Sequence, residues 1–339
     1  MRYFFTRLLL VAAPLFAWQI VELFVLPPNY FTFRPWEAAR VHNDGLFRGP
    51  FYPNQRIEMW SAGDLNPRGL RKTFVRFRTD DYGYRNPQPY NADTRYQFLL
   101  VGDSQFAGPN LHERDTLGVV LEREYGRPAY NYASGCRLCQ SFIQDTRIAK
   151  NPPKFVVLDF RPEEAFYGRF TNWPRCTPVN DSLQAMLCDP VPLWHRILYQ
   201  TTNDDVRIMY DRATRQHGYN WLRARMNLAL RKPLPGLTLQ QAERNILDFI
   251  NAMVSLQGEL RARGMTLVLL LVPVPYPEGV GDYVAGRLSP QVPMVHWQSG
   301  SPYRSDLATD PWFDEDDSHM SKLSILKCAY RIIELTSSL

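Results

Sequence analysis

From about residue 96 onward, the hydrophobic pattern of the chain alternates between short apolar runs and helical repeats. Continuous apolar runs of this length are typical of strands buried on both faces of a parallel sheet. Four such runs occur, at residues 96–103, 129–134, 154–160 and 265–273. Apolar residues spaced three and four apart predict helices over 116–124, 239–263 and 322–336. Strands that alternate with helices predict an α/β fold, a three-layer sandwich with a parallel central sheet.

About a hundred residues separate the third predicted strand from the fourth, which is too many for a plain crossover. Residues 162–238 are rich in Trp, Arg and Pro, and we expect a helical insertion there. Ligands of open α/β sheets bind beyond the carboxyl ends of the strands. The insertion could therefore serve as a lid or as a cap that contacts a glycan.

The segment before the first apolar run has a different character. Residues 29–94 are rich in aromatic residues, Pro and Arg, and contain few long apolar stretches. One short strand is predicted at 73–78 (TFVRFR), with Arg76 and Arg78 on a solvated face. We therefore expect a membrane-proximal lead-in at 29–94 and the main domain at 95–339.

The first 28 residues predict a membrane segment. Two arginines precede a stretch from Leu8 to Leu26 whose length is close to the roughly 20 residues of a transmembrane helix. An uncleaved anchor must hold Glu22 near the headgroups, whereas a cleaved signal peptide lacks a good cleavage site; a buried helix is a third interpretation. Basic residues before the stretch favour a cytoplasmic N-terminus. We expect an inner-membrane anchor with the main domain in the periplasm.

The composition excludes several classes of protein and one class of partner. With 339 residues, 45% of them hydrophobic, the chain can build a large core, which excludes a disordered chain and a small disulfide scaffold. The balance of 39 Lys+Arg against 34 Asp+Glu gives a net charge of +5, without a dense basic stripe or zinc-finger spacing. Nucleic acid is therefore not an expected partner. No cofactor or metal is expected either.

Five cysteines are compatible with an exported domain. Cys176 and Cys188 bracket a stretch that begins with turn formers, so a disulfide between them is plausible. Cys136 and Cys139 form a lone CxxC, and no second Cys/His pair at metal spacing follows it. A structural disulfide is a simpler interpretation of that pair than zinc or redox chemistry. Cys328 lies in the last predicted helix and is expected to be a buried thiol.

Two short motifs could carry chemistry. Gly102-Asp103-Ser104 ends the first predicted strand, where a serine is exposed beside backbone N–H groups that can stabilise an oxyanion. Near the other end of the chain, Asp316 precedes His319 by three residues, a spacing that lets a carboxylate hold Nδ1 and leave Nε2 free as a base. Asp317 is the alternative partner of the histidine. In a simpler interpretation, Ser104 or Asp103 only caps the following turn.

With these motifs the chain resembles the SGNH (GDSL-type) hydrolase superfamily, and within it the exported branch linked to O-acetylation of bacterial exopolysaccharides, which includes alginate-acetylation proteins. Four stretches carry the resemblance: TDDYGYRN (79–86), FLLVGDSQFAG (98–108), YNYASG (130–135) and DDSHMS (316–321). The resemblance implies that Ser104 is the nucleophile, His319 the general base and then acid, and Asp316 its orienter. It also implies an oxyanion hole that includes the N–H groups of Ser104 and Gly135.

One block departs from the superfamily. After the third strand the superfamily usually has a Gly-x-Asn-Asp block, whereas this chain reads VVLDFRPEEAF over 156–166. The third oxyanion donor is therefore not identified. Arg161 is one substitute, and Asn131 is another polar group near the second block, for which a structural role is at least as good an interpretation.

These observations predict an exported serine enzyme of acyl-ester chemistry, an O-acetyl esterase or an O-acetyltransferase that acts on a cell-envelope or secreted polysaccharide. A membrane acyltransferase is a further candidate partner. The alternative is a non-catalytic envelope protein of the same fold that binds polysaccharide or such an acyltransferase. Esterase and transferase share every catalytic residue, so the sequence does not separate them.

Overall fold

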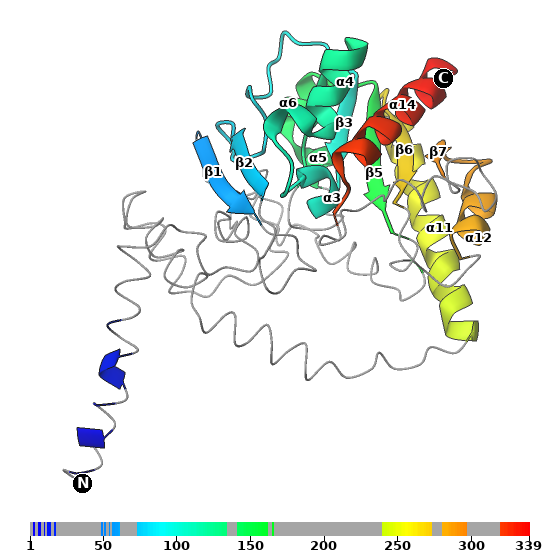
Figure 1. Cartoon of the computed structure of the whole chain (residues 1–339). Helices are drawn as coiled ribbons and strands as arrows, with labels where there is room; N and C mark the ends of the chain where they lie inside the picture. The colour runs from blue at the N-terminus through cyan, green and yellow to red at the C-terminus, as the bar shows by residue number, and fades with distance from the viewer. Residues whose placement is uncertain are drawn as a thin grey trace.

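The structure is a computed structural model and describes residues 56–61, 73–133, 141–161, 239–272, 280–296 and 319–339, with Ala165 and scattered single residues before position 55 (Figure 1). The greater part of the predicted membrane segment, the predicted insertion apart from Ala165, and the four cysteines of the two predicted disulfides lie outside these residues. In the described part of the chain, no helix is both long enough and apolar enough to cross a membrane.

A five-stranded sheet with the order β4-β3-β5-β6-β7 forms the centre of the fold. Its strands are β3 (Phe98–Val101), β4 (Ala129–Asn131), β5 (Phe155–Phe160), β6 (Thr266–Leu271) and β7 (Met294–Val295). Every neighbouring pair is parallel, which confirms the predicted parallel sheet. The four predicted strands occupy adjacent positions. The two-residue β7 was not predicted because so short a strand carries no periodic signal.

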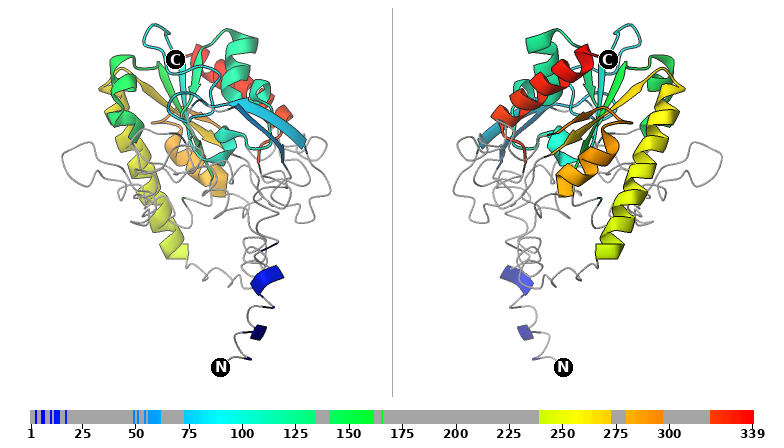
Figure 2. Two further views of the ribbon diagram at one scale, coloured as in Figure 1. Left: turned by 90° about the vertical axis from the view of Figure 1, so that its left-hand side faces the viewer. Right: turned by 90° about the vertical axis from the view of Figure 1, so that its right-hand side faces the viewer.

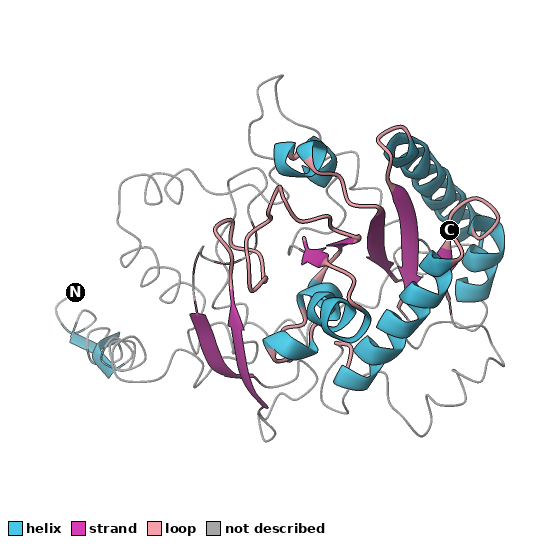
Figure 3. Ribbon diagram, turned by 90° about the horizontal axis from the view of Figure 1, so that it is seen from above, coloured by secondary structure: helices cyan, strands magenta, loops and turns pink. Residues whose placement is uncertain are grey.

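Helices cover both faces of this sheet (Figures 2 and 3). On one face lie α4 (Leu117–Tyr125) and α14 (Lys322–Ser337), and on the other α5 (Ser141–Gln144), α6 (Thr146–Lys150), α11 (Leu239–Arg261) and α12 (Val280–Leu288). Alternate strand residues serve the two faces: Val156 and Leu158 belong to the cluster with α11, whereas Val157 belongs to the cluster with α4 and α14. The fold is therefore α/β, with helices on both sides of a parallel sheet as a three-layer sandwich requires.

The three long helices begin and end close to their predicted limits. Local caps explain several of these ends. The hydroxyl of Ser321 accepts a hydrogen bond from Ser324 N and starts α14, and Gly126 adopts a left-handed conformation that ends α4. Two short elements, α3 (Ser104–Ala107) and η1 (Glu113–Asp115), escaped prediction because they span barely one turn.

The lead-in contains a separate two-stranded antiparallel sheet of β1 (Arg56–Ser61) and β2 (Thr73–Arg78). The prediction of β2 is confirmed to the residue. Its alternate side chains are buried, and Arg76 and Arg78 are exposed on one face as expected. Arg76 pairs there with Glu58 at 2.9 Å, an exposed ion pair that adds little to stability.

Cys328 is a buried free thiol, as predicted. It lies in α14 with its Sγ 3.8 Å from the Sδ of Met320. Burial raises the pKa of this thiol well above its ordinary value, so Cys328 is a packing residue of the folded protein.

The glycine in the second half of α11 offers a test of the helix. A Cβ added to Gly258 would meet no atom within 4 Å, and the residue is exposed. Gly258→Ala should therefore stabilise the protein by about 0.5–1 kcal/mol, because alanine loses less backbone entropy in a helix. Thermal unfolding of both proteins measures this, and an unchanged or lower midpoint would contradict the assignment of this stretch to a helix.

Candidate functional site

The predicted nucleophile lies at the carboxyl end of β3. The strand ends at Val101, and Ser104 is the first residue of α3, with its side chain partly exposed. Asp103 Oδ1 accepts a hydrogen bond from Gln105 N at 2.8 Å, so Asp103 caps this short helix. Of the simpler interpretations, the capping role of Asp103 is confirmed, whereas Ser104 is not the cap.

The segment of the predicted base meets this turn. His319 is buried, with 4% of its surface exposed, and precedes the cap of α14. The next residue, Met320, donates its backbone N–H to Oε1 of Gln105 at 3.0 Å, across 215 positions of sequence. A buried hydrogen bond thus joins the residue after Ser104 to the residue after His319. Asp316, Asp317 and Gly135 lie outside the described residues.

The end of β5 fixes the same turn from its other side. Asp159 Oδ1 accepts from the backbone N–H of Asp103 at 3.2 Å. Arg161 Nη2 donates to Asp103 Oδ2 at 2.6 Å, and the Arg161 side chain is 17% exposed. Both carboxylate oxygens of Asp103 therefore accept hydrogen bonds. The Arg161 guanidinium thus binds the residue directly before Ser104, at the carboxyl ends of the strands.

Gly102 allows β3 and β5 to approach at this point. A Cβ at position 102 would lie 2.1 Å from Oδ1 and 2.4 Å from Cγ of Asp159. Gly102→Ala should push the Asp159 carboxylate away from Asp103 N and destabilise the protein by about 1–3 kcal/mol. Denaturant unfolding measures the loss, and the double variant Gly102→Ala/Asp159→Ala should recover part of it. If Gly102→Ala lowers the free energy of unfolding equally in the wild-type and Asp159→Ala proteins, the contact with Asp159 is not the cause.

The segment 79–86 holds the short helix α3, which begins with Ser104. The side chain of Arg85 is buried and donates from Nη1 to the carbonyls of Ala107 and Gly108, and from Nη2 to that of Leu111. Its guanidinium also lies over the ring of Phe77, 4.2 Å from the centroid. Burial lowers the pKa of Arg85 to about 9, which leaves it charged at neutral pH.

Asp80 and Asn86 complete this support. Asp80 accepts hydrogen bonds from two backbone N–H groups of its own turn, from Asn86 Nδ2 and, at 2.5 Å, from the Tyr130 hydroxyl. The side chain of Asn86 also pairs with the backbone of Asn131, accepting from its N at 2.8 Å and donating to its O at 3.0 Å. The Asn131 side chain in turn donates to Phe106 O at 2.9 Å, a structural side-chain-to-backbone role. Burial raises the pKa of Asp80 above its ordinary value.

Another histidine lies near the same edge of the sheet. His296 follows β7, and its Nε2 is 3.2 Å from Asp282 Oδ1. Burial lowers the pKa of His296, while Asp282 opposes that shift. His112 is half-buried at the start of η1, and the other three histidines without a motif lie outside the described residues.

Gln105, Asp159 and Arg85 are among the residues of this site that were not predicted as such. Gln105 is a polar residue within the largely apolar stretch 98–108, so its buried role could have been suspected, whereas Arg85 lies in the polar stretch 79–86 and gives no such signal. Asp159 gives a weaker signal, a carboxylate at the end of an otherwise apolar strand. No known family and no curated protein matches the chain, so the SGNH resemblance stays a prediction.

Proposed function

We propose that this protein is a serine-dependent acyl-ester enzyme of the SGNH type, with Ser104 as nucleophile, His319 as general base and Asp316 as its orienter. The observation that carries the proposal is the hydrogen bond between Gln105 and Met320. It supports a shared site because each partner is the direct neighbour of one proposed catalytic residue. Residues so distant in sequence meet at the carboxyl edge of the sheet, where ligands of such folds bind.

The proposed reaction has two steps. Ser104 Oγ attacks the acyl carbonyl and gives its proton to His319 Nε2, and the negative charge on the carbonyl oxygen is stabilised by the N–H groups of Ser104 and Gly135. The alcohol then leaves with the proton from His319, and an acyl-serine remains. Water or a sugar hydroxyl attacks this ester with His319 again as base, which releases the acid or the acylated sugar.

Several contacts favour precise positioning of Ser104. Asp103 is fixed by Asp159 and Arg161, and Arg85 binds the carbonyls at and after the end of α3. A nucleophile on a rigid turn needs little reorganisation in the transition state. Arg161 is the candidate third donor to the oxyanion, although its Nη2 also serves Asp103.

The substrate and location follow from the sequence expectations. The apolar stretch from Leu8 to Leu26 and its preceding arginines support an inner-membrane anchor with the enzyme in the periplasm. The resemblance to the exopolysaccharide O-acetylation branch supports an acylated polysaccharide of the envelope or of secreted material. The protein acts as an esterase if water reaches the acyl-serine, and as an O-acetyltransferase if a sugar hydroxyl reaches it and water is excluded.

A fluorophosphonate probe tests the nucleophile directly. The full chain should gain the mass of one phosphonyl group as fluoride leaves, and Ser104→Ala should not react while it keeps the wild-type unfolding midpoint. Peptide mapping should place the adduct on Ser104. A folded wild-type protein that stays unlabelled, or a label that persists in Ser104→Ala, would remove Ser104 from the mechanism.

A second candidate function rests on one observation. No Asn stands after β5 where the superfamily usually has one, and near the end of this strand Asp159 Oδ1 accepts the Asp103 N–H and offers no donor to a substrate oxygen. A protein of this fold that binds polysaccharide or a membrane acyltransferase without catalysis would need no third donor. The fluorophosphonate experiment separates the two, because a folded but unreactive protein supports the binding function.

A further inference from the structure

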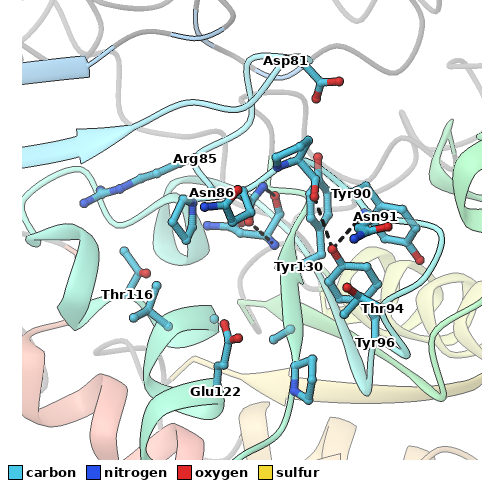
Figure 4. Close-up of a pocket in the computed structure, with 18 of the residues that line it drawn as sticks. Asp81, Arg85, Asn86, Tyr90, Asn91, Thr94, Tyr96, Thr116, Glu122 and Tyr130 are labelled. Atoms are coloured by element: carbon cyan, nitrogen blue, oxygen red, sulfur yellow. Dashed lines mark hydrogen bonds between the residues drawn. The ribbon is translucent and has the colours of Figure 1, made fainter.

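A cavity of about 440 Å³ lies along the outer edge of β4 (Figure 4). Its walls are the loop over 85–96, the first half of α4 and the strand β4 itself. Neither Ser104 nor His319 lines it, so the cavity is separate from the two described residues of the proposed catalytic site.

The edge strand offers one open peptide position to this cavity. The ladder to β3 uses Pro128 O and Tyr132 N, and strand geometry therefore turns the N–H and C=O groups of Ala129 and Asn131 outward. The side chain of Asn86 occupies both groups of Asn131. Within the described part of the chain, no residue occupies those of Ala129, which lines the cavity. A donor and an acceptor thus lie side by side and point the same way.

Tyrosine rings form the wall opposite α4. The hydroxyl of Tyr90 donates to Asn151 O, that of Tyr96 to Pro89 O, and that of Tyr130 to Asp80. Because these hydroxyls are engaged within the protein, the half-buried rings of Tyr90 and Tyr96 contribute apolar surface, whereas the Tyr130 ring is buried behind them. Tyr90 and Tyr96 stack with centroids 4.4 Å apart. Such a wall suits the C–H face of a ligand whose edge is polar.

The charges at the cavity disfavour an anion. Glu122 on α4 and Asp81 are exposed carboxylates at its rim. Arg85 is the basic residue among the lining residues, and both of its Nη atoms donate to backbone carbonyls. An anionic ligand would therefore meet two carboxylates without an open cation.

We propose that this cavity is a binding subsite for an uncharged pyranose sugar. Two adjacent hydroxyls pair with the N–H and C=O of Ala129, a third donates to the Glu122 carboxylate, and the sugar ring faces Tyr90 and Tyr96. The inference deepens the proposed function, since a polymer held here would continue beyond the residue that reacts. An added peptide strand fits less well, because the side chain of Asn86 already binds the N–H and C=O of Asn131, the next groups of β4 that face outward after Ala129.

Binding is tested by calorimetry on the full chain with cellobiose, β-1,4-galactobiose, β-1,4-mannobiose, digalacturonate and tetra-alanine. At least one neutral disaccharide should bind and digalacturonate should not. Glu122→Gln should weaken the bound sugar about tenfold through loss of a hydrogen bond to a charge. Glu124→Gln, an exposed neighbour on the same helix outside the cavity, should change nothing.

Val119→Trp gives a second variant, because it fills the cavity from α4 and should abolish binding with the fold retained. Binding of digalacturonate or tetra-alanine alone, binding of no sugar, or equal affinity in Glu122→Gln would overturn the inference. Ser104→Ala should keep full affinity. A protein that binds sugar but resists fluorophosphonate loses only the proposed catalysis, and one that is labelled but binds no sugar loses only this subsite.

Discussion

Replacing His319 with alanine should lower the rate of p-nitrophenyl acetate hydrolysis by about 10³-fold or more, because Ser104 would then have no base for its proton. The side chain is buried, so its removal also leaves a small cavity, and the variant needs a measured unfolding midpoint. The loss should fall on kcat, since the ester itself makes its binding contacts elsewhere.

His296→Ala is the matched control for this variant. His296 lies near the same edge of the sheet and pairs with Asp282, so it is the other described histidine that could act as a base there. Its replacement should leave the rate within a few-fold of wild type. A large loss in His296→Ala with full activity in His319→Ala would transfer the role of base to His296.

Replacing Arg85 with methionine should destabilise the protein by about 3 kcal/mol or more. The carbonyls of Ala107, Gly108 and Leu111 would lose their donor together, and a buried acceptor without a partner costs about 1–3 kcal/mol. Denaturant unfolding gives the value. Arg85→Lys should recover only part of it, because an ammonium cannot reproduce the planar fork.

Arg95→Met is the control, because Arg95 is exposed in the same loop region and should be neutral within about 0.5 kcal/mol. If the hydrogen bonds of Arg85 to these carbonyls position α3, folded Arg85→Lys protein should also react more slowly with the fluorophosphonate than folded wild type. Wild-type stability in Arg85→Met would show that the three hydrogen bonds are not needed.

The sequence predicted the elements whose signal is local. The apolar runs of β3, β5 and β6 and the periodic helices α4, α11 and α14 are long enough for their pattern to specify them. The strand order was not predicted, since no residue pattern states which parallel strands are neighbours. The position of β4 at the edge of the sheet, with β3 as its neighbour on one side, is therefore a finding of the structure.

The sequence proposed reactive residues for the candidate site, but it did not predict the residues that support them. Ser104 and His319 were chosen because their chemistry has a recognisable spacing. Gln105 and Arg85 act through contacts with backbone atoms more than 20 positions away, and such contacts carry no spacing signal. A single carboxylate near the end of an apolar strand, such as Asp159 in β5, carries no pattern that indicates its partner.

The buried thiol of Cys328 offers a view of how α14 moves. An alkylating reagent can reach this sulfur only when the helix separates from the sheet, so the alkylation rate of Cys328 measures how often that happens. Because His319 and Met320 lead directly into α14, each separation would also displace His319, the proposed base. Alkylation at Cys328, followed by peptide mass mapping, would therefore report how firmly the segment that contains His319 is held against the sheet.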